Sequence, residues 1–276
     1  MLLKKEITPP HSLQSGYILM VLLVIMTLGA ATWFSSGTQN LGKALRDAHT
    51  QAKLKEMEII KQKLLTYASL TPEIMQTESS SSPPPAYTYK NVPGPGYLPC
   101  WDNNGDGEMN CAFNDYTPNY LPRQISTRNL YFSAQPKDYY YVLDHRFAIQ
   151  NAAYNNGSTS RYAPLNPSVT PALELNNNGK KYVALIIYAP KGLNAANQDG
   201  DKEFVSRGLL NPGVEDLIVG ITQDEWEEVV LRRVCNLRTL LNTSSANNFW
   251  YRNYDSVNNP AGNSWENYFT SGGTCP

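Results

Sequence analysis

The feature that most constrains this chain is a long uncharged segment near its N-terminus. No Asp, Glu, Lys or Arg occurs from Tyr17 to Asn40, and the part from Tyr17 to Phe34 reads YILMVLLVIMTLGAATWF. An α-helix rises about 1.5 Å per residue, so roughly 20 apolar residues cross the ~30 Å hydrocarbon core of a bilayer. The segment therefore predicts a single membrane-spanning helix.

The flanking charges and the cysteines predict the orientation of this helix. Two lysines, Lys4 and Lys5, precede the segment. Two basic residues, Lys43 and Arg46, follow it, so the positive-inside rule favours a cytoplasmic N-terminus only slightly. All four cysteines lie after the segment, as in domains exported to an oxidising compartment. We therefore expect a cytoplasmic N-terminus and an exported globular domain.

The cysteines themselves predict two structural disulfides. They are even in number and show no CxxC spacing for zinc or thioredoxin-like chemistry: Cys100, Cys111, Cys235 and Cys275. Cys100 with Cys111 closes a short loop of turn-forming residues. Cys235 with Cys275 ties a predicted helix to an otherwise loose C-terminus. We expect these two pairings.

Three classes of protein fit the apolar segment. A secretory signal peptide has a shorter apolar run and a small-residue cleavage site, which LGAATWFSSG matches only weakly. A plain membrane anchor needs nothing beyond the segment itself. The third class depends on LQSGYILMVLLVIM, where a polar leader ends in Gly16 and the apolar run starts at Tyr17. This junction resembles the cleavage site of type IV prepilins.

The resemblance implies a processing site, a location and partners. A prepilin peptidase cuts after the glycine and methylates the new N-terminus, so residues 1–16 are expected to be the leader and Gly16 and Tyr17 the processing pair. Such proteins sit in the inner membrane with the globular domain in the periplasm, or enter a cell-surface filament. The expected partners are other pilin or pseudopilin subunits, the peptidase and the inner membrane.

One position departs from the pattern of major pilins. Their mature fifth residue is a glutamate, and Val21 holds that place here. A carboxylate in an apolar filament core needs a partner, which in this family is the terminal amine of a neighbouring subunit. Family members without the glutamate tend to be minor subunits at or near the tip. The resemblance therefore favours a minor pilin or pseudopilin.

A second helical pattern continues the apolar segment into water. Apolar residues recur at spacings of three and four: Leu41, Leu45, Ala48, Ala52, Met57, Ile60, Leu64 and Ala68. We expect one stem helix over residues 17–70, a membrane part followed by an amphipathic part. A dimeric coiled coil is the alternative. Pro72 and the Ser/Pro-rich run predict a linker over 71–95, followed by a globular domain over 96–276.

The segment between the first two cysteines, CWDNNGDGEMNC, carries half of a calcium-loop pattern. Its oxygen-bearing residues fall at the expected spacing: Asp102, Asn104, Asp106, Glu108 through its carbonyl, and Asn110. The closing glutamate is missing, because Phe113 holds the twelfth position and only Asp115 lies near. The alternative is a calcium-free turn, since Asn, Asp and Gly also dominate ordinary turns. Calcium is the one cofactor that the sequence suggests.

A further resemblance covers this segment and parts of the body. GYLPCWD followed by GDG and a cysteine resembles the GRLPCPD type of segment in prepilin-like proteins of Gram-negative bacteria, with Trp101 in place of a proline. KKYVALIIYAPKG and EDLIVGITQDEWEEVVLRRV share the resemblance. It implies a class of protein rather than a defined activity.

The body predicts an α+β fold. Lys180–Gly192 is a continuous apolar run typical of a central strand, Asp216–Ile221 a shorter strand, and the segment from Tyr139 a strand or a helix. Thr222 and Glu225 form a capping box that opens a helix. The apolar face of this helix is Trp226, Val229, Val230, Val234, Leu237 and Leu241. We expect an antiparallel sheet, this further helix and a disulfide-pinned tail.

No pattern indicates an enzyme or nucleic-acid binding. The net charge is −1, and the chain has no GxSxG, HExxH, Walker or GxGxxG motif in a suitable context. His145 is the only histidine of the body, and a structural role is expected for it.

The expected function is a minor pilin or pseudopilin that takes part in assembly, initiation or the tip of a pilus or a type II secretion pseudopilus. The alternative is a membrane-anchored binding or adhesion module. It would use the aromatic residues of the C-terminal tail: Trp250, Tyr251, Tyr254, Trp265, Tyr268 and Phe269. The same residues would instead cover the core if the tail packs on the body, which is the favoured expectation.

Overall fold

The computed structural model describes the chain in ten stretches: 12–78, 94–109, 115–123, 138–148, 155–156, 159–160, 165–208, 213–243, 251 and 264–276. The chain divides into two compact units, Met1–Lys53 and Leu54–Pro276. The described residues of the first unit form the first part of one long helix, and the second unit contains the rest of that helix, the sheets and the remaining helices.

Helix α1 (Ser12–Glu78) corrects the predicted membrane span. Over the part of the chain that the structure describes, no helix is both long and apolar enough to cross a membrane. The prediction of a membrane-spanning stem helix is therefore wrong.

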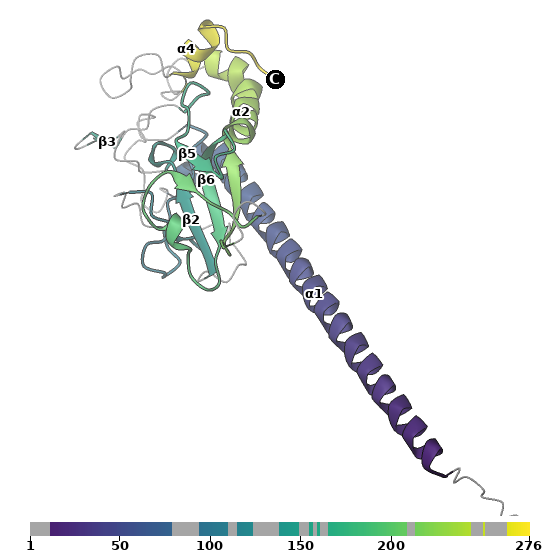
Figure 1. Ribbon diagram of the computed structural model, residues 1–276. Coiled ribbons are helices and arrows are strands. Elements are labelled where there is room, and N and C mark those ends of the chain that lie inside the picture. The colour runs from purple at the N-terminus through teal and green to yellow at the C-terminus, as the bar shows by residue number, and fades with distance from the viewer. Residues whose placement is uncertain are drawn as a thin grey trace, which may run out of the picture. The chain divides into compact units, whose positions relative to one another are not determined.

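The second unit is an α+β fold built on one sheet (Figure 1). Its strands follow the order β1 (Asn119–Tyr120), β2 (Tyr139–Leu143), β6 (Lys181–Tyr188), β5 (Leu173–Leu175) and β7 (Glu203–Phe204), and β8 (Leu217–Thr222) also pairs with β6. The predicted central strand is confirmed as β6, which pairs with three strands. All pairs of this sheet are antiparallel except β5 with β7, which is parallel where an antiparallel sheet was expected.

The two faces of β6 bury different clusters. Ile186 and Tyr188 face a cluster that includes residues of α1 and of the later helix α2, whereas Leu185 and Ile187 face a second cluster against β5 and β7. The alternation breaks at Val183, which lies on the same side as its neighbour Ala184 because the register with β8 shifts there. Both faces are therefore covered, which explains the continuous apolar run of this strand.

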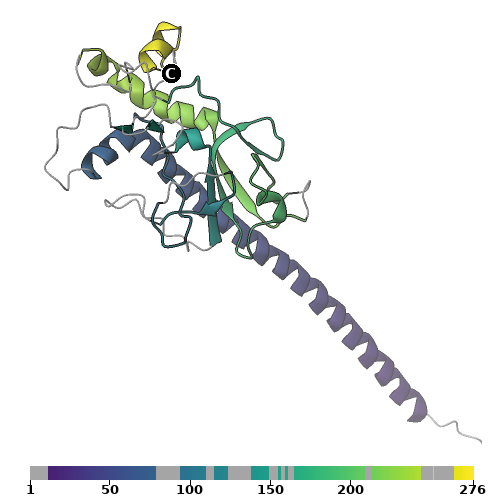
Figure 2. The same cartoon turned by 90° about the vertical axis from the view of Figure 1, so that its left-hand side faces the viewer.

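Helix α2 (Gln223–Thr243) follows β8 directly and begins with the predicted capping box. The backbone N–H of Glu225 donates to Thr222 Oγ1 at 3.3 Å, and the N–H of Thr222 donates to Glu225 Oε2 at 3.0 Å. The capping box is thus confirmed. Glu225 Oε1 also accepts from Nζ of the buried Lys61 at 2.5 Å, so the helix start is tied to α1 within the second unit (Figure 2).

Helix α1 continues past Pro72, where the sequence predicted its end. Proline has no N–H to donate to the carbonyl four residues earlier, which leaves the Ala68 oxygen without its helical partner. The N–H of Gly96 donates to that oxygen at 2.7 Å, and Thr71 Oγ1 donates to the carbonyl of Tyr97 at 2.9 Å. Contacts with the 96–97 segment therefore offset the missing helical hydrogen bond.

The remaining elements are short. The segment from Tyr139 forms β2 and then the 3-10 helix η4 (His145–Phe147). A two-stranded sheet joins β3 (Asn155–Asn156) to β4 (Thr159–Ser160), and η5 (Ala195–Asn197) precedes β7. The chain ends after α4 (Trp265–Thr270).

Candidate functional site

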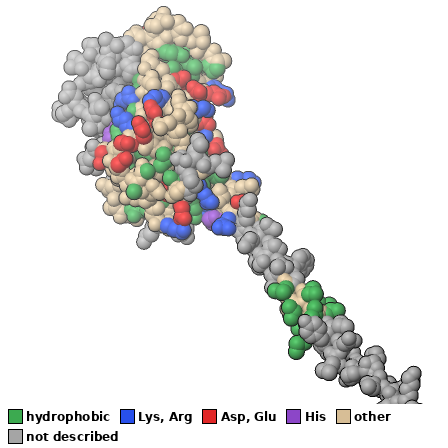
Figure 3. All heavy atoms as spheres, in the orientation of Figure 1, with side chains coloured by type: hydrophobic (Ala, Val, Ile, Leu, Met, Phe, Trp, Pro, Cys, Tyr) green, Lys and Arg blue, Asp and Glu red, His purple; other side chains and the backbone are tan. Residues whose placement is uncertain are grey.

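The most unusual surface of the described chain is an apolar band on α1, the residues Met20–Leu28. All its large apolar side chains are exposed, by fractions from 41% for Val21 to 73% for Met20. Figure 3 shows these hydrophobic side chains gathered on the helix. Soluble proteins rarely leave a contiguous apolar patch uncovered unless it binds something. The apolar band is therefore the first candidate site.

The one polar side chain of the apolar band is satisfied within the helix. Thr27 Oγ1 donates to the carbonyl oxygens of Leu23 and Val24, at 2.9 and 3.0 Å. The band thus has no need of a polar partner. The predicted processing residues Gly16 and Tyr17 lie four and three residues before Met20 in the same helix, and their side chains lie outside the described residues.

The loop after Cys100 is organised around the buried carboxylate of Asp102. Its Oδ1 accepts from the N–H groups of Asn104 at 3.1 Å and Gly105 at 2.6 Å. Its Oδ2 accepts from the N–H of Gly107 at 2.7 Å. The backbone of Asp102 also pairs with Tyr120 on β1. Three backbone donors therefore hold both oxygens of this carboxylate.

The other predicted calcium ligands lie at the surface of the same loop. Asp106 accepts from the N–H of Glu108 at 2.7 Å and from Asn104 Nδ2 at 2.7 Å, and these bonds lower the pKa of the Asp106 carboxyl. Asn110 and Phe113 lie outside the described residues. In the described stretches, no group of three or more His, Cys, Asp and Glu side chains is arranged to hold a metal ion. The hydrogen bonds support the calcium-free turn, and the calcium site stays a prediction.

The structure predicts that Asp102 is essential to this loop. Replacing Asp102 by Ala leaves three buried or half-buried N–H groups without their acceptor, which we expect to lower the free energy of unfolding by about 3 kcal/mol. Urea unfolding followed by fluorescence measures the change. The matched control is Asp106→Ala, which removes an exposed carboxylate and should lower the free energy of unfolding far less. Equal losses in the two variants would show that burial of Asp102 does not matter.

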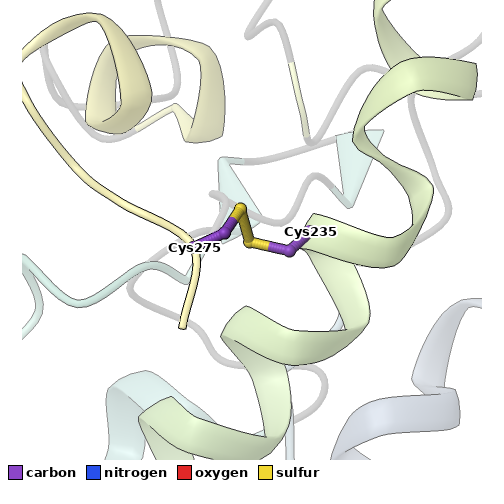
Figure 4. Close-up of a disulfide and its surroundings, with 2 residues drawn as sticks. All are labelled: Cys235 and Cys275. Carbon is purple, nitrogen blue, oxygen red and sulfur yellow. A yellow bond between two sulfur atoms is a disulfide. The ribbon is translucent and has the colours of Figure 1, made fainter.

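The disulfide prediction is confirmed for one of its two pairs. Cys235 on α2 is bonded to Cys275, with a Cα–Cα distance of 5.8 Å and a sequence separation of 40 residues (Figure 4). Cys100 is also disulfide-bonded, but Cys111 lies outside the described residues, so its pairing stays a prediction. The confirmed bond fixes the C-terminal tail to α2.

His145 lies at the start of η4 in an aromatic environment. Its ring stacks on Tyr116 with centroids 4.3 Å apart and meets Trp101 edge-on at 5.8 Å. Its Nε2 lies 3.0 Å from the carbonyl oxygen of Asp115. Burial is the main cause that lowers the pKa of the ring. This packing is what the expected structural role requires.

The described aromatic residues of the tail face the core. Tyr251, Trp265 and Phe269 are buried, and Tyr268 is half-buried against them. Arg238 of α2 lies over the Phe269 ring, 4.2 Å from its centroid. Trp250 and Tyr254, the other members of the predicted binding surface, lie outside the described residues.

Sequence reasoning missed a polar cluster at the end of β2. Asp144 is fully buried and receives two side-chain hydrogen bonds from Arg146, at 3.0 and 2.6 Å. It also accepts from the N–H of Ala172 at 2.7 Å, just before β5. An acidic residue two positions before an arginine is too common a pattern to have indicated this contact.

Comparisons with protein-family models, with curated protein sequences and with solved structures found no match to this chain.

Proposed function

We propose that this protein is a minor type IV pilin-like or pseudopilin-like subunit, a structural component rather than an enzyme. It takes part in the assembly, initiation or tip of a pilus or of a type II secretion pseudopilus. The observation that carries the proposal is the exposed apolar band, because the chain itself provides no cover for it within the described residues.

The pattern of the apolar band supports several helical neighbours rather than one. Successive residues of a helix are turned by about 100°, so the nine residues of the band, eight of them apolar, pass around the axis more than twice and leave no polar face. A single partner helix covers only one stripe of such a surface. Apolar helices of several surrounding subunits cover all of it, as in the core of a filament.

Val21 supports a minor rather than a repeating position. In the proposed filament core, a subunit with a carboxylate at this place neutralises the terminal amine of its neighbour. Val21 supplies no carboxylate, and it belongs to the exposed apolar band. The subunit is therefore expected to be incorporated rarely.

Processing and export belong to the same proposal. Cleavage between Gly16 and Tyr17 places the apolar band at the fourth residue of the mature chain. The Cys235–Cys275 disulfide supports a globular unit that folds in an oxidising compartment such as the periplasm.

The alternative, a binding module that uses the aromatic tail, gains no support from the described residues. Tyr251, Trp265 and Phe269 are buried and pack on the core, so their rings are not presented to a ligand. We therefore do not adopt this alternative.

The proposal is tested by placing a charge in the apolar band. Val24→Lys buries an unpaired ammonium in the filament core at a cost of several kcal/mol, so we expect incorporation to fall by at least about tenfold. The variant is produced in cells with the pilus or secretion genes of the same genome. Quantitative mass spectrometry of sheared filaments measures incorporation and also identifies the mature N-terminus, which should be Tyr17.

The matched control is Val24→Ile, which keeps the position apolar and should be incorporated like the unchanged protein. Three results would contradict the proposal: normal incorporation of Val24→Lys, absence of the unchanged protein from filaments, or an abundance equal to that of the major subunit. Binding of the purified protein to lipid vesicles, lost in Val24→Lys without any effect on filaments, would instead assign the band to a membrane surface.

A further inference from the structure

Two Asn-Gly pairs in described turns form a matched pair of sites. Asn104-Gly105 lies in the loop after Cys100, and Asn178-Gly179 lies in the turn between β5 and β6. Both glycines have positive φ, 77° for Gly105 and 74° for Gly179. A third pair, at residues 156–157, lies partly outside the described residues.

The asparagine side chains are held in the same way at the two sites. Asn104 Oδ1 accepts from the N–H of Asp106 at 3.2 Å, and Asn178 Oδ1 accepts from the N–H of Lys180 at 2.9 Å. Each Nδ2 also donates at 2.7 Å, from Asn104 to Asp106 Oδ2 and from Asn178 to the hydroxyl of Tyr182. In both turns the carboxamide therefore folds over the glycine that follows it.

The two glycine nitrogens differ. The N–H of Gly105 donates to the carboxylate of Asp102 at 2.6 Å. The N–H of Gly179 makes no hydrogen bond within the described part of the chain. The surroundings differ as well: a Cβ at Gly105 would lie 3.5 Å from the ring of Tyr120, whereas a Cβ at Gly179 would meet nothing within 4 Å.

We propose that Asn178 is a site of spontaneous deamidation and that Asp102 protects Asn104 from the same reaction. The backbone nitrogen of the glycine loses its proton to water and attacks Cγ of the asparagine. A C–N bond forms, the bond from Cγ to Nδ2 breaks, and ammonia leaves with a proton, which gives a succinimide. Water then opens either carbonyl of this ring, which yields aspartate or isoaspartate.

The reaction needs a glycine nitrogen that is accessible and able to carry developing negative charge. At Gly105 the bond to Asp102 must break first, and a fixed carboxylate 2.6 Å away disfavours a second negative charge on the nitrogen. At Gly179 neither obstacle exists. Loss of one charge-assisted hydrogen bond before reaction corresponds to a rate at least about tenfold lower at Asn104.

Deamidation at residue 178 acts on the pairing of the central strand. The turn joins β5 to β6, and Glu174 of β5 pairs with Lys181 at the start of β6. Aspartate at this position loses the amide donor to Tyr182, and isoaspartate also adds a methylene to the backbone of the turn. The second product shifts the register at this end of the hairpin.

The experiment follows both sites in the same protein. The purified full chain is incubated in mildly alkaline buffer, and peptide mapping by mass spectrometry quantifies deamidation at Asn104 and Asn178 over time. We expect Asn178 to react about tenfold faster or more in the folded protein. In guanidinium, where only the shared Asn-Gly sequence remains, we expect the two rates to converge.

Equal rates in the folded protein, or a faster reaction at Asn104, would overturn the proposal. A difference that persists in guanidinium would overturn it as well, because sequence context would then explain it. Asp102→Ala removes the protecting carboxylate and should raise the Asn104 rate towards that of Asn178. If Asn104 still deamidates slowly in this variant, and circular dichroism shows that the variant is folded, Asp102 is excluded as the protecting group. If the variant does not fold, the comparison of the folded and unfolded protein decides alone.

Discussion

Replacing Trp226 by alanine is expected to lower the free energy of unfolding of the second unit by about 3–5 kcal/mol. Trp226 is fully buried at the start of α2. Its indole N–H donates to the carbonyl of Gly96 at 2.9 Å, and Phe147 meets its ring edge-on at 5.0 Å. Trp226 of α2 thus contacts η4 and the backbone of Gly96. The N–H of Gly96 in turn donates to the Ala68 carbonyl of α1.

The fit around Trp226 explains why we expect Trp226→Ala to leave a cavity that the surrounding chain does not fill. Gly96 has φ 113°, and a Cβ there would lie 2.8 Å from the indole Cζ2, so the ring rests directly on the backbone. Urea unfolding followed by far-ultraviolet circular dichroism measures the loss without depending on tryptophan emission. Trp226→Phe is the control, which keeps an aromatic ring, loses the N–H donor and should cost clearly less. Similar losses in the two variants would show that the hydrogen bond, not the packed volume, dominates.

Local patterns explain why part of this fold could be predicted. The capping box needs only Thr222 and Glu225, three residues apart, and the structure forms it. The central strand β6 is apolar on both faces because both are covered, and such a run is visible in the sequence. The Cys235–Cys275 pair was also predictable, since one cysteine lies in a helix and the other next to the chain end.

Long-range contacts explain what the sequence could not provide. Pro72 predicts a helix end, whereas the structure continues the helix and brings in the N–H of Gly96, through the tertiary fold, as a donor to the Ala68 carbonyl. The parallel pairing of β5 with β7 likewise depends on where residues 195–204 return to the sheet. The predicted span rested on the hydropathy of the sequence alone, and no helix in the described residues is long and apolar enough to provide it.

For the two candidate sites, only the types of residue could be predicted from the sequence. The apolar residues of the band are evident in the sequence, but their exposure is a property of the structure. In the loop after Cys100, the Asp and Asn spacing suggested ligands for a cation. The structure instead uses Asp102 to bind three backbone N–H groups of its own loop.

The second large effect is expected at Asp144, for which Asp144→Ala should lower the free energy of unfolding by about 3 kcal/mol. Asp144 is fully buried, and its carboxylate accepts from Arg146 and from the N–H of Ala172. Truncation leaves a half-buried guanidinium and the backbone N–H groups of Arg146 and Ala172 without this acceptor. The same contacts join the end of β2 to the segment that leads into β5, so their loss acts on two strands of the sheet.

A double-mutant cycle separates the ion pair from the backbone contact. If the unpaired guanidinium causes most of the loss, Arg146→Ala in the Asp144→Ala background restores part of the stability, and the two changes are not additive. Arg146 Nη2 also donates to the carbonyl of Thr170, so some loss from the Arg146 change remains. The exposed pair of Lys191 and Glu215 is the control, and Lys191→Ala should change stability by less than about 1 kcal/mol. Strict additivity of the Asp144 and Arg146 changes would mean that the backbone N–H groups of Arg146 and Ala172, and not the guanidinium, make this buried carboxylate stabilising.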